Sequence, residues 1–344
     1  MKRFALILIL TSMAVAQTKA RDESKKPLTL ASQGSFFVGG ESKTMPAGGR
    51  GAAGEITINQ MYVQYQIPVN GSQHVPVVMV HGCCLSSKTW ETTPDGRMGW
   101  NEYFVRKDRS VYLADQSSRA RSGFDPSTIN AVKAGTIPPS QLPNVLAATH
   151  QTAWSIFRFG PKFGEAFPDE QFPIEAMDEL YKQMIPDLNS TLPNPNPTWK
   201  NMAALAVKLN GAILMGHSES GFFPEQAALI DPKGIKGLIS IEMPCPELKP
   251  EEIAALAKIP TLVMFGDHLG DVQGFATWPA SFESCNKFVQ QLKDKGGDAE
   301  MMSLPKLGIK GNSHMLMQDR NNLQLADLIL TWIDGHVEGK KKNR

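Results

Sequence analysis

Short, uninterrupted apolar runs recur from residue 75 onward, each closed by polar residues or glycine. Segments long enough for a helix separate these runs. Strands covered on both faces of a parallel sheet need continuous apolar runs, whereas half-exposed strands alternate. The pattern therefore predicts an α/β fold with a doubly wound, mostly parallel sheet. The predicted strands are residues 77–80, 111–114, 212–215, 238–241 and 262–265, and the predicted helices are residues 222–230, 281–295 and 323–336.

The segments before residue 75 follow a different pattern. Residues 58–67 place Met61, Val63 and Tyr65 on one face and polar residues between them, which is the period of a half-buried strand. Residues 34–40 form a short predicted strand between glycine turns. We expect the two strands to pair as an antiparallel hairpin at the N-terminal edge of the sheet.

Residues 126–197 interrupt the alternation of strands and helices, with 11 of the 24 prolines of the chain in this stretch. This proline density disfavours long helices. The stretch also contains a tryptophan and several phenylalanines, which argue against a disordered linker. We interpret about residues 126–200 as a cap inserted in a single domain over residues 27–340. The alternative is a surface excursion without function.

The first residues place Lys2 and Arg3 before an apolar run that ends at a small-residue site, Ala14-Val15-Ala16. This is the layout of a secretory signal peptide. The run is shorter than the ~20 apolar residues that span a bilayer. We predict that residues 1–16 are removed, with cleavage as late as residue 20 as the other option. The mature chain is then periplasmic or secreted and not bound to a membrane.

The charges are balanced, with 35 Lys and Arg against 34 Asp and Glu. Without a basic surplus, a nucleic-acid partner has no electrostatic support. Two adjacent cysteines lack the CxxC spacing of a zinc site, and no histidine lies near Cys245 or Cys285 at the spacing of metal ligands, so we expect no metal. No organic cofactor is implied. The expected partner is a small-molecule substrate. Whether the chain forms a homodimer is an open question.

The four cysteines are Cys83, Cys84, Cys245 and Cys285. An even number in an exported chain favours disulfides over free thiols. Three pairings exist, and the residues alone do not choose between them. A bond between adjacent cysteines is strained, because a trans peptide holds the two Cα atoms ~3.8 Å apart, below the usual disulfide range.

The segment Gly216-His217-Ser218-Glu219-Ser220-Gly221 lies between a predicted strand and a predicted helix. This context is typical of a nucleophile elbow, a sharp turn that needs small residues two before and two after the nucleophile. Ser218 is the candidate nucleophile, and Ser220 replaces the usual glycine. The segment lacks the lysine of a P-loop and the glycine spacing of a dinucleotide-binding loop.

A serine hydroxyl needs an adjacent base, which follows the nucleophile in the chain for this kind of elbow. Three histidines do so. His336 lies in a Lys-rich tail, and His268 lies at the end of a predicted strand. His314 lies in a loop before the last helix, and we predict that it is the base.

A carboxylate has to orient the base. Glu242 ends the predicted strand over residues 238–241, whereas Asp267 and Asp271 follow the next one. Chain order alone favours the two aspartates.

The oxyanion of the reaction needs two backbone N–H groups. Glu219, the residue after the nucleophile, supplies one. The second is expected from Cys83 in the loop His81-Gly82-Cys83-Cys84. We expect His81 to shape this loop and His217 to pack beside the elbow.

Five segments together resemble a small group of secreted bacterial α/β-hydrolase serine esterases that carry an HGCC motif. These segments are GSFFVGG at residues 34–40, VHGCC at 80–84, DQSSRARSG at 115–123, GHSESG at 216–221 and SIEMPCP at 240–246. The resemblance covers about residues 27–336. It implies an α/β-hydrolase fold and the triad Ser218, Glu242 and His314, which reverses the preference for Asp267 or Asp271. It also implies oxyanion donors at Cys83 and Glu219 and the bonds Cys83–Cys84 and Cys245–Cys285.

The expected activity is hydrolysis of a carboxylic ester through an acyl-enzyme on Ser218. A lactone or carbon–carbon bond hydrolase uses the same three groups and is the first alternative. A non-catalytic binding module of the same fold is the second. Dehalogenase and epoxide hydrolase chemistry is disfavoured because those enzymes have an aspartate at the position of Ser218.

Overall fold

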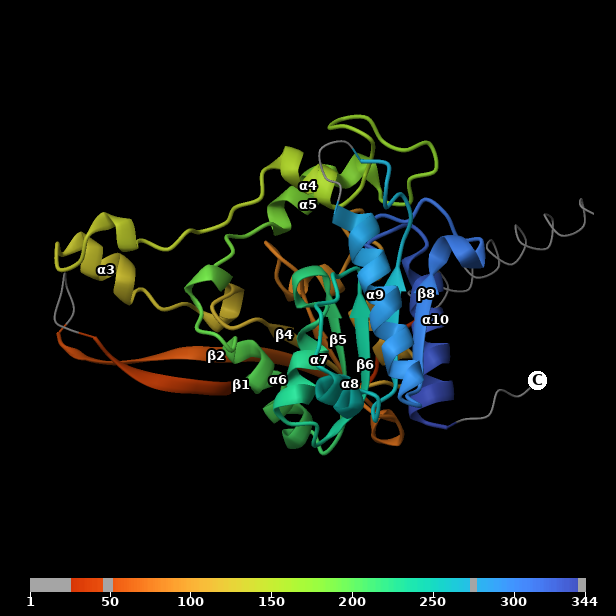
Figure 1. The fold of residues 1–344 in the computed structure, drawn as a ribbon, viewed down its shortest axis with the longest axis horizontal. Coiled ribbons are helices and arrows are strands. Elements are labelled where there is room, and N and C mark those ends of the chain that lie inside the picture. The colour runs from red at the N-terminus through yellow and green to blue at the C-terminus, as the bar shows by residue number, and fades with distance from the viewer. Residues whose placement is uncertain (1–25, 46–51, 273–276, 340–344) are drawn as a thin grey trace, which may run out of the picture.

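The computed structural model describes residues 26–45, 52–272 and 277–339. An eight-stranded sheet in the order β1-β2-β4-β3-β5-β6-β7-β8 forms its centre (Figure 1). β1 is antiparallel to β2 and β2 to β4, and all later neighbours are parallel. The strands are β1 (Leu30–Met45), β2 (Gly54–Pro68), β3 (Val77–Val80), β4 (Val111–Asp115), β5 (Ala212–His217), β6 (Ile235–Ile241), β7 (Thr261–Phe265) and β8 (Ala299–Ser303). The sheet confirms the predicted fold class. The predicted signal peptide, residues 1–16, lies outside the described residues.

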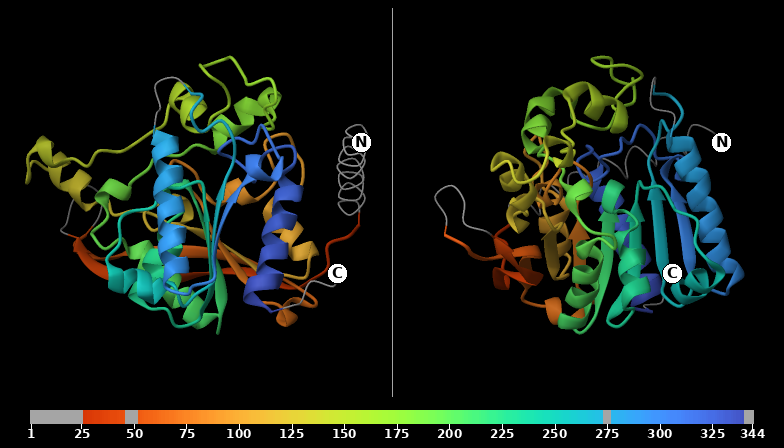
Figure 2. Two further views of the ribbon diagram at one scale, coloured as in Figure 1. Left: turned by 45° about the vertical axis from the view of Figure 1, so that its right-hand side comes forward. Right: turned by 60° about the vertical axis from the view of Figure 1, so that its left-hand side comes forward.

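The parallel strands inside the sheet consist mostly of apolar residues because both faces of the sheet are covered. In β3, Val77 and Met79 join one hydrophobic core, and Val78 and Val80 join the other. Helices α2 and α10 pack on the first face, and α6 to α9 pack on the second (Figure 2). The helices are α2 (Trp100–Arg106), α3 (Ser127–Lys133), α4 (His150–Ile156), α5 (Met177–Gln183), α6 (Pro197–Lys208), α7 (Phe223–Ile230), α8 (Pro250–Leu256), α9 (Thr277–Asp294) and α10 (Asn322–Trp332).

The N-terminal hairpin is longer than the sequence predicts, because β1 covers 16 residues rather than residues 34–40. As an edge strand, β1 pairs only with β2, so its outer part needs no apolar residues. The hairpin projects from the body of the molecule, with α3 near its tip (Figure 1). An ion pair of 2.5 Å between Lys43 and Asp125 joins it to the segment before α3.

Residues 126–197 contain only short helices, as their prolines predict. α3, α4 and α5 have seven residues each. Trp154, Phe157, Phe159 and Phe172 are buried and belong to the same core as α2 and α10. The interpretation of this segment as a cap stays a prediction.

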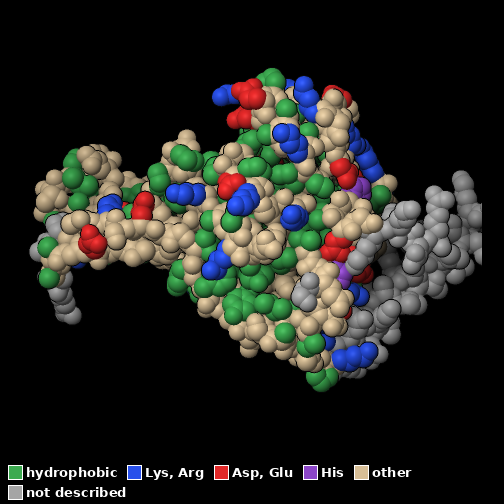
Figure 3. Space-filling model, turned by 90° about the horizontal axis from the view of Figure 1, so that it is seen from below, with side chains coloured by type: hydrophobic (Ala, Val, Ile, Leu, Met, Phe, Trp, Pro, Cys, Tyr) green, Lys and Arg blue, Asp and Glu red, His purple; other side chains and the backbone are tan. Residues whose placement is uncertain are grey.

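On the face that Figure 3 shows, basic and acidic side chains are interspersed among hydrophobic ones. Across the described residues, no helix is both long and apolar enough to cross a membrane.

Candidate active site

Ser218 directly follows β5 and begins a single 3-10 turn, Ser218–Ser220. Its φ is 57°, in the left-handed region that non-glycine residues rarely adopt. A Cβ atom at Gly216 would collide with the backbone of Ser220, and one at Gly221 with the side chain of Met243. The turn therefore has the sharp strand–turn–helix geometry of a nucleophile elbow.

Ser220 has a bonding role that the usual glycine at this position cannot have. Its hydroxyl accepts a hydrogen bond from the N–H of His217 (3.1 Å) and donates one to the carbonyl of Val80 (2.9 Å). The second bond ties the elbow to the end of β3. The replacement of glycine by serine therefore adds a link between two strands of the site.

His314 lies in the loop between β8 and α10, as predicted. Its Nδ1 is 3.1 Å from Oε2 of Glu242. Because a carboxylate only accepts hydrogen bonds, Nδ1 carries the proton and Nε2 keeps a lone pair. Nε2 is buried without a hydrogen-bond partner among the described residues, so no hydrogen bond to Ser218 is formed in the structure. Such bonds are often long before substrate binds.

Aromatic rings enclose the imidazole of His314. The ring centroids of His217 and Trp278 lie 4.5 Å away, and that of Phe157 lies 5.6 Å away. Burial lowers the pKa of His314, although Glu242 acts in the opposite direction. The imidazole is therefore neutral at neutral pH, the state that a general base needs. His217 packs beside the elbow, as predicted, with Nε2 2.9 Å from the carbonyl of His314.

Glu242 follows β6 with a φ of 54° and is fully buried. Arg158 donates two hydrogen bonds to it, Nη1 to Oε2 (2.8 Å) and Nη2 to Oε1 (2.7 Å). The N–H of Gly266 donates a third. Burial alone raises the pKa of Glu242, but the charge of Arg158 and the bonds from His314 and Arg158 outweigh it and lower the pKa to about 2. Glu242 is therefore ionised beside His314.

Sequence reasoning missed Arg158. It lies in the proline-rich segment, its side chain is fully buried, and its φ is 58°. Its Nε donates to the carbonyl of Asp267 (2.9 Å), and its guanidinium lies over the ring of Trp278. In the sequence, the only sign that Arg158 is buried is its position between Phe157 and Phe159. This sign is weak, because arginine side chains are usually exposed.

The alternative acids have other partners. Asp267 accepts hydrogen bonds from the N–H groups of His268 (2.8 Å) and Gly311 (3.0 Å). Asp271 lies 3.0 Å from Nδ1 of His268. Within the described ranges, neither hydrogen-bonds to His314.

The loop after β3 passes close to the nucleophile. A Cβ atom at Gly82 would lie 2.7 Å from Cβ of Ser218. Among the residues that the structure describes, the N–H of Cys83 donates no hydrogen bond. His81 orders this loop, because its Nε2 accepts from the N–H of Gln116 (3.2 Å) and its Nδ1 bonds the carbonyl of Gly82 (2.9 Å). Burial lowers the pKa of His81 to about 4, so the ring is neutral.

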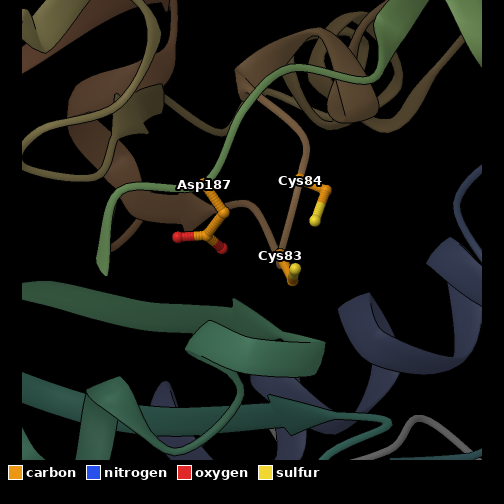
Figure 4. A group of neighbouring side chains, drawn as sticks. All are labelled: Cys83, Cys84 and Asp187. Carbon is orange, nitrogen blue, oxygen red and sulfur yellow. The ribbon is translucent and has the colours of Figure 1, made fainter. Parts of the chain in front are cut away.

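Cys245 and Cys285 form a disulfide that joins the segment after β6 to α9. This excludes the pairings of Cys83 or Cys84 with either of them. Cys83 and Cys84 are free thiols in the structure, which differs from the vicinal bond implied by the resemblance (Figure 4). The vicinal bond stays a prediction, and it would be strained because its Cα atoms are only ~3.8 Å apart.

Three groups of side chains in the described ranges hold ligand-type atoms within 4.8 Å of one another. In each group, carboxylates already pair with a cation or a histidine. Asp187 pairs with Arg119, Glu338 with Arg109, and Asp169 with His268. We therefore assign no metal to these groups.

Known proteins share this fold, and a solved bacterial esterase also shares much of the sequence. No family model matches the chain. A fungal protein (Fungal sp., strain ATCC 74256) named "Probable secreted lipase phiG" is 26% identical over 328 residues, which cover 79% of this chain and 85% of the relative. A solved structure of a novel bacterial esterase is 51% identical, with a TM-score of 0.86, and the match covers 91% of this chain and 98% of the esterase.

The fold and the site thus define an α/β hydrolase that cleaves esters. The chain belongs to the family of this bacterial esterase, with which it shares half of its residues over nearly the whole length.

Proposed function

We propose that the protein is a serine carboxylesterase that works through an acyl-enzyme on Ser218. The hydroxyl of Ser218 attacks the ester carbonyl, and Nε2 of His314 takes its proton and returns it to the leaving alcohol. Glu242 orients His314 and stabilises its cation. The N–H groups of Cys83 and Glu219 stabilise the oxyanion, and a water molecule then releases the acid.

The hydrogen-bond chain from Arg158 through Glu242 to His314 is the main support for this proposal. Its members are fully buried, and it leaves only Nε2 of His314 without a partner within the described part of the chain. The left-handed φ of Ser218 and the close approach of Gly82 favour the same roles. Strained residues of this kind are common at catalytic sites.

The test is hydrolysis of a short-chain p-nitrophenyl ester by the mature protein and its Ser218→Ala variant. We expect the variant to fold normally and to lose at least ~1,000-fold in kcat, as expected when a triad member is removed. A fluorophosphonate probe should add one label to the peptide that contains Ser218. Turnover retained in Ser218→Ala, or a label on another residue, would refute the assignment.

We further propose that residues 1–16, or up to residue 20, are a signal peptide and that the protein acts in the periplasm or outside the cell. The secreted name of the fungal relative and the Cys245–Cys285 bond support this location. Mass spectrometry of the exported protein measures the cleavage point. A thiol count of the unfolded protein tests the vicinal bond, because free Cys83 and Cys84 give two thiols and the bond gives none.

A further inference from the structure

The side chain of Glu219, the residue after the nucleophile, meets a second carboxylate. Nη2 of Arg119 lies 3.3 Å from Oε2 of Glu219 and 2.5 Å from Oδ1 of Asp187. Arg119 and Asp187 are 1% and 4% exposed, and the Glu219 side chain is 24% exposed. We call these three residues the Arg119 cluster. In it, two carboxyl groups share one guanidinium nitrogen in a largely buried place.

One guanidinium cannot neutralise two carboxylates. Two carboxyl groups that share a site hold one proton more easily than two negative charges. Oδ2 of Asp187 is buried and has no hydrogen-bond partner among the described residues. An ionised carboxylate only accepts hydrogen bonds, so two ionised carboxylates cannot bond to each other. The side chains of Asp187 and Glu219 also interact with each other by a hydrogen bond, which two carboxyl groups form only when one of them carries a proton.

The electrostatics of the cluster agree with this geometry. Burial raises the pKa of Glu219, Arg119 opposes the rise, and the charge of Asp187 adds to it, which brings the pKa to about 7. Burial alone also raises the pKa of Asp187, but Arg119 outweighs it and lowers that pKa. The proton therefore resides mainly on Glu219.

The cluster is joined to the oxyanion loop on both sides. Nε2 of Gln116 donates to Oε2 of Glu219 (3.2 Å) and to the carbonyl of His81 (2.7 Å). Nη1 of Arg119 donates to the carbonyl of Gly82 (3.4 Å). A change of charge at Glu219 therefore acts on both predicted oxyanion donors, the N–H groups of Glu219 and Cys83.

The other titratable groups that face the cluster are one histidine and two cysteines. His81 is neutral because it is buried. The thiols of Cys83 and Cys84 lie beside Asp187 (Figure 4). The thiol of Cys83 donates a hydrogen bond to Cys84, and this bond and burial raise the pKa of Cys83, while the same bond lowers the pKa of Cys84. The neighbouring amide of Asn189 carries no charge.

We propose that Glu219 and Asp187 hold one proton between them in the active esterase, and that Glu219 is a positioning residue whose deprotonation slows ester hydrolysis. With the proton, the Arg119 cluster has no net charge. Without it, the cluster carries one negative charge, one residue from the nucleophile. That charge opposes the oxyanion of the transition state, so kcat should fall roughly tenfold as the proton is lost. KM for an uncharged ester should change little, because the oxyanion is absent in the ground state.

This inference rests on the proposed function, and its test is the pH profile of kcat between pH 5 and 10. The profile is measured with a short-chain p-nitrophenyl ester at the isosbestic wavelength of nitrophenol. The wild-type protein should lose activity above about pH 7, the value to which the pKa of Glu219 is raised. Glu219→Gln and Asp187→Asn each leave one carboxylate to pair with Arg119, so both variants should lose this alkaline decline. Either variant suffices if the other does not fold.

Glu225→Gln is the matched control. Burial raises the pKa of Glu225 to about 7 as well, but its partner is the hydroxyl of Ser240 and not the Arg119 cluster. This variant should keep the alkaline decline. A flat wild-type profile, or an unchanged decline in Glu219→Gln or Asp187→Asn, would overturn the inference. Failure of the proposed function appears elsewhere, as turnover retained in Ser218→Ala.

Discussion

Several residues of the site have backbone angles that ordinary side chains avoid. Ser218, Glu242, Arg158 and Cys84 all have φ between 54° and 60°. Each such residue costs about 1–3 kcal/mol and persists only where the surroundings fix it. The fixing contacts here are the glycines around the elbow and the bidentate bonds between Arg158 and Glu242. The site is therefore held rigid before substrate binds.

Replacement of Arg158 by Met should harm both stability and the pH range of activity. Glu242 would be left as a buried charge without its guanidinium, which typically costs about 3–5 kcal/mol. Arg158 lowers the pKa of both Glu242 and His314, so its removal raises both. Unfolding in urea should show the loss of stability, and the acid limb of the kcat profile should move to higher pH.

Arg320→Met is the control for this experiment. Arg320 pairs with Glu175 at the surface, with side chains 43% and 62% exposed. Exposed pairs contribute about 0–1 kcal/mol, so this variant should be nearly as stable as wild type and keep its acid limb. An acid limb that stays in place in Arg158→Met would show that Arg158 has only a structural role.

The roles of single residues differ in how far a sequence predicts them. Ser218 lies in a local motif whose turn needs small neighbours, so its place could be predicted. Glu242 depended on a resemblance, because strand order alone favours Asp267. Arg158 could not be predicted, because its burial depends on contacts with Glu242 after β6 and with Trp278 of α9, which are distant in the chain.

At the scale of elements, the disulfide fastens the loop after β6 to α9. The bonded cysteines are 40 residues apart. Closing a loop of that length in the unfolded chain is worth about 4 kcal/mol in the chain-entropy model. Cys245 lies three residues after Glu242, and among the described residues neither bonded cysteine forms a hydrogen bond with the predicted triad.

The double variant Cys245→Ala, Cys285→Ala should therefore be less stable by up to about 4 kcal/mol and keep most of its kcat. Thermal unfolding and ester hydrolysis at a temperature well below the transition measure the two effects. Wild-type protein should show the same loss of stability in a strong reductant. A large loss of kcat in a folded double variant would mean that the bond positions Glu242.

The elements themselves were predicted where burial imposes a pattern. Parallel strands β3 to β7 lie inside the sheet with both faces covered, so their apolar runs fix them within a few residues. β8 was not predicted, because it lies at the edge of the sheet and its sequence, AEMMS, is no continuous apolar run. β1 was predicted too short because an exposed edge strand has no such constraint. The sequence of residues 126–197 shows no helical period of apolar residues, so the positions of its helices could not be predicted. The prolines indicated only that these helices would be short.

At the scale of the whole molecule, buried ionisable groups set how stability depends on pH. Burial lowers the pKa of three histidines, His81, His217 and His314. Below about pH 6.5, these histidines bind protons in the unfolded chain but stay neutral in the folded chain. They therefore reduce the free energy of unfolding as pH falls. Glu242, with a pKa of about 2, adds a further loss as pH falls below its ordinary value of 4.5.

Other carboxyl groups act in the opposite direction. Burial raises the pKa of Glu170, Glu219, Glu225 and Asp319. The folded protein keeps these protons when the unfolded chain has already released them, so stability falls as pH rises above about 4.5. The histidines oppose this trend only up to about pH 6.5.

The free energy of unfolding should therefore be greatest between about pH 4.5 and 6.5 and should decline on both sides. Below this window the loss comes from Glu242 and the buried histidines, and above it from the carboxyl groups with raised pKa values. Urea unfolding at pH 3 to 9 measures the curve. Glu225→Gln removes one titrating group and should reduce the fall in stability between about pH 4.5 and 7, because a side-chain amide has no proton to lose there. A stability maximum above pH 8 would contradict the protonated state of these carboxyl groups, including the proton that we assign to Glu219.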